Sequence, residues 1–481
     1  MKLLSSLTAS SSRRVRISPP CLCTRVLAST RSLHTKIDLI SDLEQRGFVQ
    51  QITSREKCIK SLETPRAVYL GVDPTAEYLH VGHLLPLMTL FHFQLRGHKT
   101  IPLIGGATGL VGDPSGRDTE RPLSDGAKVE HNVQKLSAAV LKFLSGAGRY
   151  ATKKFPNLEN VISTPEIKSN LEWFKGMGLL EFLRTVGLHA RVNTMIARES
   201  VSARLASQQG ISFTEFSYQL LQAYDFYILH KNAGCSVQIG GSDQWGNILA
   251  GIDLINKLDP EVGKDGSHEE KVFGVTTPLL TTPSGAKFGK SAGNAVALDR
   301  HITSVFDFYQ FFLRTPDSHV GKYLKLFTLL PLEDIENALQ KHNEQPETRS
   351  AQRLLADEVT ELVHGEQGVI QAKFATKILY ESDLTSIKTQ EVLDALEGDS
   401  RLHVLPENEL LETTIVKLAV NAKLVSSNSG ARQLISSKGL YVNNKPVGDV
   451  RQKIEKDELL DNRVVVVRAG SQKQVVLVSA E

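Results

Sequence analysis

Two histidines, His80 and His83, lie where a predicted strand gives way to a predicted helix. The strand is the apolar run 67–72, and a helical pattern then continues as far as Gly97. At a helix N-terminus, unpaired backbone N–H groups and the positive end of the helix dipole attract anions. Imidazoles there can donate to oxygens whose charge grows in a transition state, and Gly82 lets the backbone approach a nucleotide. The pattern favours a phosphate site, although the same spacing also occurs as an ordinary capping arrangement.

A second cationic segment stands far along the chain. Lys287 and Lys290 lie in a glycine-containing stretch that follows the turn-forming residues 283–285. Two ammonium groups on a mobile loop can close over pyrophosphate as it leaves, although Lys-rich loops are usually solvated surface. The order strand, histidine pair, helix and lysine pair is the one that a divided nucleotide-binding domain requires. Together the two segments predict adenylate transfer, with ATP as a substrate.

Length and composition indicate a multidomain globular protein. The 481 residues, 41% of them hydrophobic, suit about three domains. No apolar run reaches the roughly 20 residues of a bilayer-crossing helix, so no membrane partner is expected. Seven basic residues, many serines and no carboxylate precede Asp38, which is typical of an organellar transit peptide over 1–37. We expect a mitochondrial matrix address; the alternatives are a chloroplast and an untargeted basic tail.

Charge and cysteines restrict the possible partners. Removal of the seven basic residues turns the net charge of +3 into −4, so any RNA contact must come from local patches. Two of the four cysteines fall in the transit segment, and Cys58 and Cys235 are far apart in sequence. Neither a disulfide framework nor a protein-bound metal site is predicted.

The pattern of elements changes along the chain. From 38 to 300, β-type runs alternate with helical patterns, which predicts an α/β domain with a Rossmann-like, doubly wound parallel sheet. Ligands of such sheets gather at the carboxyl ends of the strands. The glycine-bearing turns expected there are 71–73, 105–109 and 240–243.

The C-terminal part has a different composition. Residues 301–396 have helical periodicity and predict an α-helical domain, and 397–411 is predicted to be a linker. Residues 412–481 carry eleven Lys or Arg against seven Asp or Glu, so this terminal module is locally basic. The charged stretch 259–270 is interpreted as a surface insertion of unknown purpose.

One predicted helix, 216–225, carries a polar face. Tyr218, Gln222 and Asp225 follow the spacing i, i+4, i+7. Burial of a phenol, an amide and a carboxylate together is unfavourable unless a ligand or partner satisfies them. A small ligand with an ammonium and a hydroxyl group would do so, and Tyr69 could face the same pocket. A structural hydrogen-bond network is the alternative.

Beyond the transit segment, the chain resembles the bacterial-type tyrosyl-tRNA synthetases, in their mitochondrial branch. The matching stretches are 71–76, 80–83, 105–116, 212–216, 222–225, 240–247 and 287–291, in family order. The resemblance implies a class I catalytic domain at 38–300, an anticodon-binding helical domain at 301–396 and an S4-like α+β RNA-binding domain at 412–481. It also implies a homodimer, with tRNA(Tyr) contacted through Arg432 and Lys445.

The resemblance also implies roles within the catalytic domain. Tyr69 and Asp225 would bracket the phenolic hydroxyl of tyrosine. The full tyrosine-binding set is Tyr69, Thr108, Asp113, Asn193, Tyr218, Gln222, Asp225 and Gln244. ATP would be bound by Asp73, Gly82, Arg117, Arg121, Gly241, Asp243, Leu280 and Lys290, and the catalytic residues would be Thr75, His80, His83, Lys287 and Lys290.

The implied mechanism needs no protein nucleophile. The tyrosine carboxylate would attack the α-phosphorus of ATP in line, Mg²⁺-pyrophosphate would leave, and a terminal ribose hydroxyl of tRNA would take the tyrosyl group. Two alternatives remain open: a tryptophan-type synthetase or another adenylyl transferase on the same scaffold, and an RNA-binding protein, such as an intron-splicing factor, that has kept a synthetase body.

Overall fold

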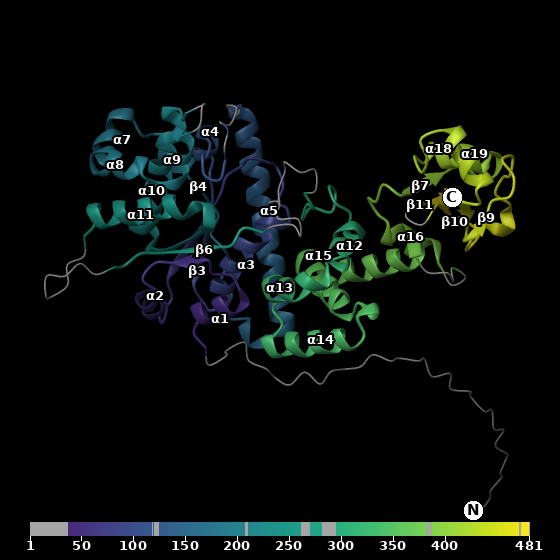
Figure 1. The fold of residues 1–481 in the computed structure, drawn as a ribbon, viewed down its shortest axis with the longest axis horizontal. Coiled ribbons are helices and arrows are strands. Elements are labelled where there is room, and N and C mark those ends of the chain that lie inside the picture. Colours follow the sequence, from purple (N-terminus) through teal and green to yellow (C-terminus); the bar gives the residue numbers. More distant parts are fainter. Residues whose placement is uncertain are drawn as a thin grey trace, which may run out of the picture.

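The structure is a computed structural model of the chain (Figure 1) and describes residues 37–117, 119, 125–206, 210–260, 270–280, 295–380, 384, 387–470 and 473–480. Several sequence predictions fall outside these residues, namely the transit segment up to residue 36, Arg121, Lys287, Lys290 and most of the stretch 259–270. The described residues form an α/β part, a helical part and a smaller α+β part at the C-terminal end (Figure 1).

Six described strands form the first sheet, in the order β1-β6-β5-β2-β3-β4. Their bounds are β1 (Gln51–Ile52), β2 (Ala67–Val72), β3 (Lys99–Ile104), β4 (Lys168–Ser169), β5 (Cys235–Gly241) and β6 (Phe273–Thr277). All neighbouring pairs run parallel except that β1 lies antiparallel to β6. The predicted doubly wound parallel sheet is confirmed, with an antiparallel strand added at one edge.

Long helices cover both faces of this sheet. They are α3 (Val81–Leu95), α5 (Gly126–Lys154), α10 (Phe213–Ala233) and α11 (Trp245–Leu258). Val68 and Leu70 of β2 pack in one core with α3 and α5, whereas Tyr69 packs with α10 and α11. Because side chains alternate across a strand, this continuous apolar run buries both of its faces.

Short helices complete the α/β part. They are α1 (Leu39–Arg46), α2 (Arg55–Ser61), α4 (Thr108–Val111), α6 (Leu171–Phe174), α7 (Leu179–Thr185), α8 (Val192–Ile196) and α9 (Glu199–Ala206). The helices α6 to α9 connect β4 to α10, and α7, α8 and α9 lie together at one end of the α/β part (Figure 1).

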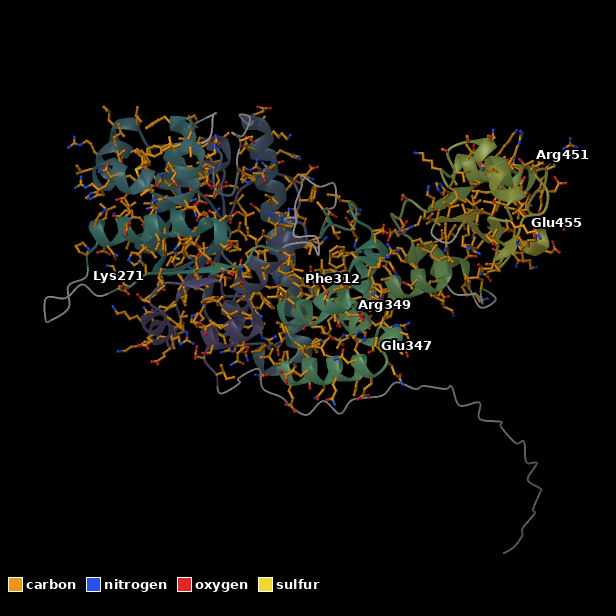
Figure 2. All side chains as sticks on the ribbon, viewed as in Figure 1. Lys271, Phe312, Glu347, Arg349, Arg451 and Glu455 are labelled. Atoms are coloured by element: carbon orange, nitrogen blue, oxygen red, sulfur yellow. The ribbon has the colours of Figure 1, made fainter. Side chains whose placement is uncertain are left out.

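The predicted helical domain is confirmed as an all-helical stretch. Its helices are α12 (Val305–Leu313), α13 (Asp317–Phe327), α14 (Leu332–Glu344), α15 (Ser350–Tyr380) and α16 (Thr389–Ala395). Phe312 lies in its interior (Figure 2) and belongs to the same apolar core as α3 and α5. Within α15, Gly365 has φ 77° and ψ 177°, so the helix is broken there. No helix of the described segments has the length and apolarity to cross a bilayer.

The C-terminal part is built on a second sheet whose five described strands lie in the order β7-β11-β10-β8-β9. Its elements are β7 (Leu402–Leu405), α17 (Glu407–Glu412), α18 (Ile415–Asn421), α19 (Asn428–Ser436), β8 (Leu440–Val442), β9 (Lys445–Pro446), β10 (Val464–Ala469) and β11 (Lys473–Ser479). Part of the predicted linker 397–411 is regular structure, because β7 lies within it and pairs in parallel with β11.

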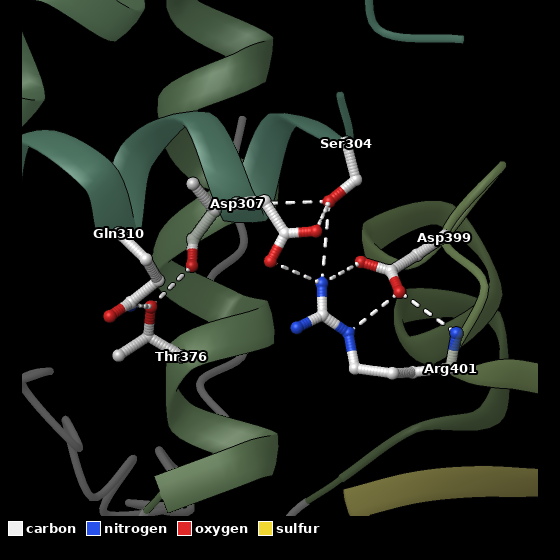
Figure 3. A network of polar contacts seen from close by, with 7 residues as sticks. Ser304, Asp307, Gln310, Thr376, Asp399 and Arg401 are labelled. Carbon is white, nitrogen blue, oxygen red and sulfur yellow. Dashed lines mark hydrogen bonds and ion pairs between the residues drawn. The ribbon is translucent and has the colours of Figure 1, made fainter. Parts of the chain in front are cut away.

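Polar contacts of Arg401 link this sheet to the helical part (Figure 3). Arg401, just before β7, donates from Nε to Asp399 (2.7 Å) and forms an ion pair with Asp307 of α12 (2.9 Å). Its guanidinium also donates to the hydroxyl of Ser304, the N-cap of α12, and lies 4.3 Å from the ring centroid of Phe306. The start of the C-terminal sheet is therefore tied to the start of α12.

Candidate active site

A cleft of about 870 Å³ opens at the carboxyl ends of β2, β3, β5 and β6. This is the edge at which ligands of doubly wound sheets bind. The predicted residues that line it are Tyr69, Asp73, Thr75, His80, Gly82, His83, Thr108, Asp113, Arg117, Tyr218, Gln222, Asp225, Gly241, Asp243, Gln244 and Leu280. Side chains that are far apart in sequence thus share one cavity.

The histidine pair forms the N-terminal cap of α3. The N–H of Gly82 donates to Nδ1 of His80 (3.1 Å), and the N–H of His80 donates to Nδ1 of His83 (3.1 Å). The two ring centroids are 3.9 Å apart. A ring nitrogen that accepts a hydrogen bond carries no hydrogen, so each neutral imidazole carries its hydrogen on Nε2. The cap thus selects the tautomer that can donate to an anionic oxygen.

The far end of the cleft holds a buried phenol and a buried carboxylate. Tyr69 and Asp225 are 1% and 2% exposed, and Tyr69 Oη has no hydrogen-bond partner among the described residues. Burial raises the pKa of Asp225 from 3.8 to about 7. Burial and the nearby Asp225 charge raise the pKa of Tyr69 well above its usual value, so Tyr69 remains a donor. One group can donate to a ligand hydroxyl and the other can accept from it.

Two residues that the sequence analysis missed hold Asp225 in place. Asn170 Nδ2 donates to one carboxylate oxygen (3.1 Å), and Trp173 Nε1 donates to the other (2.8 Å). Asn170 is fully buried and also donates to Thr108 Oγ1 (3.1 Å). It therefore connects the turn after β3 to the carboxylate on α10.

Asn193, predicted to bind the same ligand, is not among the residues that line the cleft. It is exposed on the short helix α8, within the layer that connects β4 to α10. Asn170, the residue directly after β4, occupies the place where an asparagine contacts Asp225. Asn170 does not line the cleft either and acts through the carboxylate of Asp225, whereas the role predicted for Asn193 stays a prediction.

A second carboxylate, Asp113, lies at the middle of the cleft. It accepts from Gln244 Nε2 (2.7 Å) and from the backbone N–H of Ser115 (2.9 Å). Asn247 Nδ2 lies 3.1 Å from Gln222 Oε1 and 3.3 Å from Gln244 Oε1 and so joins these side chains. Among the described residues Asp113 has no Lys or Arg partner. A buried carboxylate in that state favours a ligand that carries an ammonium group.

Asp73 organises the turn between the two ends of the cleft. Its carboxylate accepts from Tyr218 Oη (2.8 Å) and from Thr108 Oγ1 (2.8 Å). A Cβ atom on Gly105 would collide with this carboxylate, which explains the glycine at the end of β3. In the polar face predicted for 216–225, Tyr218 and Asp225 are buried and Gln222 is half-buried, and all three are hydrogen-bonded and line the cleft.

The nucleotide side of the cleft is built from strand ends. Thr75 follows β2, Gly241 ends β5, Asp243 lies in the next turn, and Leu280 lies just beyond β6. No group of three or more His, Cys, Asp or Glu side chains that could hold a metal occurs within the described ranges.

Comparison with known proteins agrees with this geometry. The family model "tRNA synthetases class I (W and Y)" matches residues 60–381, and the model "Tyrosine--tRNA ligase SYY-like C-terminal domain" matches residues 401–478. A tyrosine--tRNA ligase of Lactobacillus johnsonii is 43% identical over 92% of this chain and 99% of its own length. The chloroplastic/mitochondrial tyrosine--tRNA ligase of Arabidopsis thaliana is 41% identical over 92% of this chain and 83% of its own.

A solved structure shows the same fold. The C-terminally truncated mitochondrial tyrosyl-tRNA synthetase of Aspergillus nidulans superimposes with a TM-score of 0.65, at 36% identity, over 71% of this chain and 94% of that one. The two family models together span the α/β, helical and C-terminal parts described above. The chain therefore belongs to the tyrosine–tRNA ligase family of class I tRNA synthetases.

Proposed function

We propose that this enzyme activates tyrosine with ATP and transfers the tyrosyl group to tRNA(Tyr) for organellar translation. The observation that carries the proposal is the single cleft that holds the capped histidine pair at one end and the buried Tyr69–Asp225 pair at the other. The first suits a triphosphate, and the second suits the hydroxyl of a phenol.

In this proposal the tyrosine side chain reaches the far end of the cleft. Its hydroxyl accepts from Tyr69 Oη, which otherwise has no partner in the described part of the chain, and donates to Asp225. Asp113, Tyr218 and Gln222 hold the ammonium group, and Gln244 faces the carboxylate. Phenylalanine would leave Tyr69 and Asp225 unpaired, and this family of enzymes is itself the familiar example of a site that rejects an analogue without the hydroxyl.

ATP, the second substrate, occupies the other end together with its Mg²⁺. The Nε2–H groups of His80 and His83 donate to phosphate oxygens as charge moves onto the leaving pyrophosphate. Thr75, Asp73, Gly241, Asp243 and Leu280 contact the nucleotide, and Arg117, Arg121, Lys287 and Lys290 neutralise the phosphates. Catalysis then consists of alignment and charge stabilisation.

Exchange of labelled pyrophosphate into ATP tests this proposal. Exchange that depends on tyrosine and is absent with phenylalanine or tryptophan is expected. Exchange with tryptophan instead would favour the tryptophan-type alternative. RNA binding without any exchange would indicate a binding protein on a synthetase scaffold.

The pKa of Asp225 predicts a pH dependence for tyrosine use. Because that pKa is raised to about 7, the carboxyl group gains a proton as the pH falls through 7 and becomes a weaker acceptor for the substrate hydroxyl. We expect kcat/KM for tyrosine to fall about tenfold between pH 8 and pH 6. Initial-rate measurements across this range check it. The Asp225→Asn variant should have lower activity with a flatter profile, and a flat wild-type profile would contradict the assignment.

The RNA side of the reaction is assigned to the parts beyond residue 300. We propose that 301–396 contacts the anticodon end of tRNA and that the C-terminal module, with its S4-like character, contacts the folded RNA through exposed Arg432 on α19 and Lys445 on β9. Arg451 lies at the outer edge of the same module (Figure 2). Separated cations of this kind suit contacts to phosphates rather than to bases.

The quaternary structure that we propose is a homodimer. Large apolar side chains are exposed on α7 to α9 and at the start of α10, helices that lie together at one end of the α/β part (Figure 1). They are Leu179, Leu180, Leu183, Leu188, Val192, Ile196, Leu205 and Phe213. An apolar surface of this extent marks an interface, and a second copy of the chain can cover it symmetrically.

Introduction of charge into this apolar surface should dissociate the dimer. Leu180 and Phe213 are 75% and 76% exposed, so Leu180→Asp combined with Phe213→Asp leaves the fold intact while two buried charges per subunit oppose association. Light scattering after size exclusion should give half the wild-type mass. The matched control changes Ile302 and Ile370, both exposed elsewhere, to aspartate and should remain dimeric. An unchanged mass for the first variant would place the interface elsewhere.

An organellar location completes the proposal. The Arabidopsis relative is named chloroplastic/mitochondrial, and two fungal structural relatives are named mitochondrial. Together with the basic, carboxylate-free segment 1–37, these names support import into the mitochondrial matrix, with a plastid as the alternative. N-terminal sequencing of protein recovered from purified organelles tests both the address and the removal of the segment.

A further inference from the structure

A second cavity, of about 670 Å³, lies outside the catalytic cleft. Its walls are α5, the segments 77–79 and 298–300, and the broken part of α15 around Gly365, and it shares no lining residue with the cleft. The helices α5 and α15 contact each other beside it (Figure 1). A cavity of this size holds a ligand as large as a mononucleotide.

Besides Lys153, four cationic side chains line this cavity. Lys135, Lys142 and Arg149 follow one another at seven-residue intervals on α5 and therefore lie on one face of the helix. Arg300 belongs to the opposite wall. Among the described residues, none of these four cations has an ion-pair or side-chain hydrogen-bond partner.

The four carboxylates of the cavity each have an ion-pair or hydrogen-bond partner. Glu361 and Glu366 both bind Lys153, at 2.9 Å each. Glu77 lies 3.5 Å from His131, and a carboxylate oxygen of Asp299 accepts the backbone N–H of His301. With Lys153 included, five cationic side chains line the cavity against four carboxylates, and this net positive charge favours an anionic ligand.

A buried imidazole and an apolar wall complete the cavity. His364, next to the break in α15, has a buried Nε2 without a hydrogen-bond partner in the described part of the chain. Burial and the nearby Arg300 and Lys142 lower its pKa to about 3, so the ring is neutral. Its Nε2 can donate a hydrogen bond to a ligand or accept one from it, according to the tautomer. Phe143 and Tyr78 supply apolar surface.

We propose that this cavity binds a free, phosphate-bearing small molecule of mononucleotide size, with its phosphate at the cations and its ring against the apolar wall. Guanidinium and ammonium groups without protein partners are the usual phosphate ligands. The proposal concerns a site apart from the reaction and does not depend on the roles assigned in the cleft.

Ligand binding here would affect the catalytic cleft through the backbone. The wall segment 77–79 continues directly into His80, and the N–H of Leu298 donates to the carbonyl of Leu79 (2.8 Å). The N–H of Val81 likewise donates to the carbonyl of Val296 (3.0 Å). The cavity wall and the histidine cap thus share one hydrogen-bonded pair of segments.

Calorimetry on the full-length enzyme tests the proposal once the cleft is filled with a non-hydrolysable tyrosyl-adenylate analogue. The four ribonucleoside 5′-monophosphates are then titrated in turn. We expect at least one of them to bind with one equivalent per chain. The double variant Lys142→Gln/Arg149→Gln, whose side chains are both exposed, should bind it about tenfold or more weakly.

The control variant Lys60→Gln/Lys128→Gln removes the same charge from exposed positions outside the cavity and should bind like the wild type. The proposal is overturned if no monophosphate binds the analogue-filled enzyme or if both double variants weaken binding equally. It is also overturned if the cavity variant loses only tRNA affinity, because the cations would then belong to an RNA-backbone contact.

Discussion

The Asp225→Ala variant is expected to lose about 10²- to 10³-fold in kcat/KM for tyrosine while its affinity for ATP stays close to that of the wild type. Removal of one partner from a buried, charged hydrogen-bonded set costs about 2–5 kcal/mol. In this case the donors Asn170 and Trp173 lose their acceptor, and the substrate hydroxyl loses one of its two proposed contacts. In the proposed arrangement ATP binds at the other end of the cleft and would touch none of these groups.

Pyrophosphate exchange gives kcat/KM for tyrosine, and equilibrium dialysis gives the affinity for ATP. The Asp225→Asn variant is the matched control for shape, because it keeps the side-chain volume and one acceptor oxygen. It should lie between the wild type and the alanine variant. Equal losses toward tyrosine and ATP in the alanine variant would indicate general damage to the cleft and would contradict the assigned role.

Substitution of His83 should slow adenylate formation without changing tyrosine binding. Loss of a donor that acts on developing charge reduces the rate about 10²- to 10³-fold. His83 also accepts the backbone N–H of His80 (3.1 Å) at the start of α3, so His83→Ala removes both a cap and the proposed catalytic donor. A lost cap alone lowers the free energy of unfolding by about 1 kcal/mol.

The His83→Asn variant separates these two contributions. Its amide oxygen can accept the same N–H group that Nδ1 accepts, but it has no donor at the position of Nε2. Thermal unfolding should therefore show wild-type stability for His83→Asn, whereas single-turnover adenylate formation remains as slow as in His83→Ala. Recovery of the rate in the asparagine variant would mean that the histidine serves only to cap the helix.

Much of this architecture could be predicted because β2, β3 and β5 are apolar runs of six or seven residues with a glycine at or next to the carboxyl end. The predicted run 67–72 coincides with β2, and the turns predicted after β2, β3 and β5 all line the cleft. In a doubly wound sheet the ends of parallel strands meet at one edge. Sequence order alone therefore places His80, Asp113 and Asp243 near one another.

The errors arose where elements are too short to leave a periodic signal. The strand β4 has only two residues, so nothing marked Asn170 as the residue that follows a strand at the cleft edge. The family resemblance implies Asn193, which lies outside the cleft lining. In the same way, the four-residue strand β7 lies in a stretch that has the composition of a linker, and only its pairing with β11 reveals that it completes a sheet.

Under the proposal that the C-terminal module contacts tRNA, the Arg401 contacts affect which RNA lengths the enzyme can bind. Because the guanidinium holds Asp307 of α12 and Asp399 together, the C-terminal module has a set orientation before any RNA arrives, and association loses less rotational freedom than a flexible tether would. The fixed distance between the catalytic cleft and this module then limits the length of RNA that can contact both. An RNA with an intact acceptor end but a stem longer or shorter by a few base pairs would engage one end and miss the other.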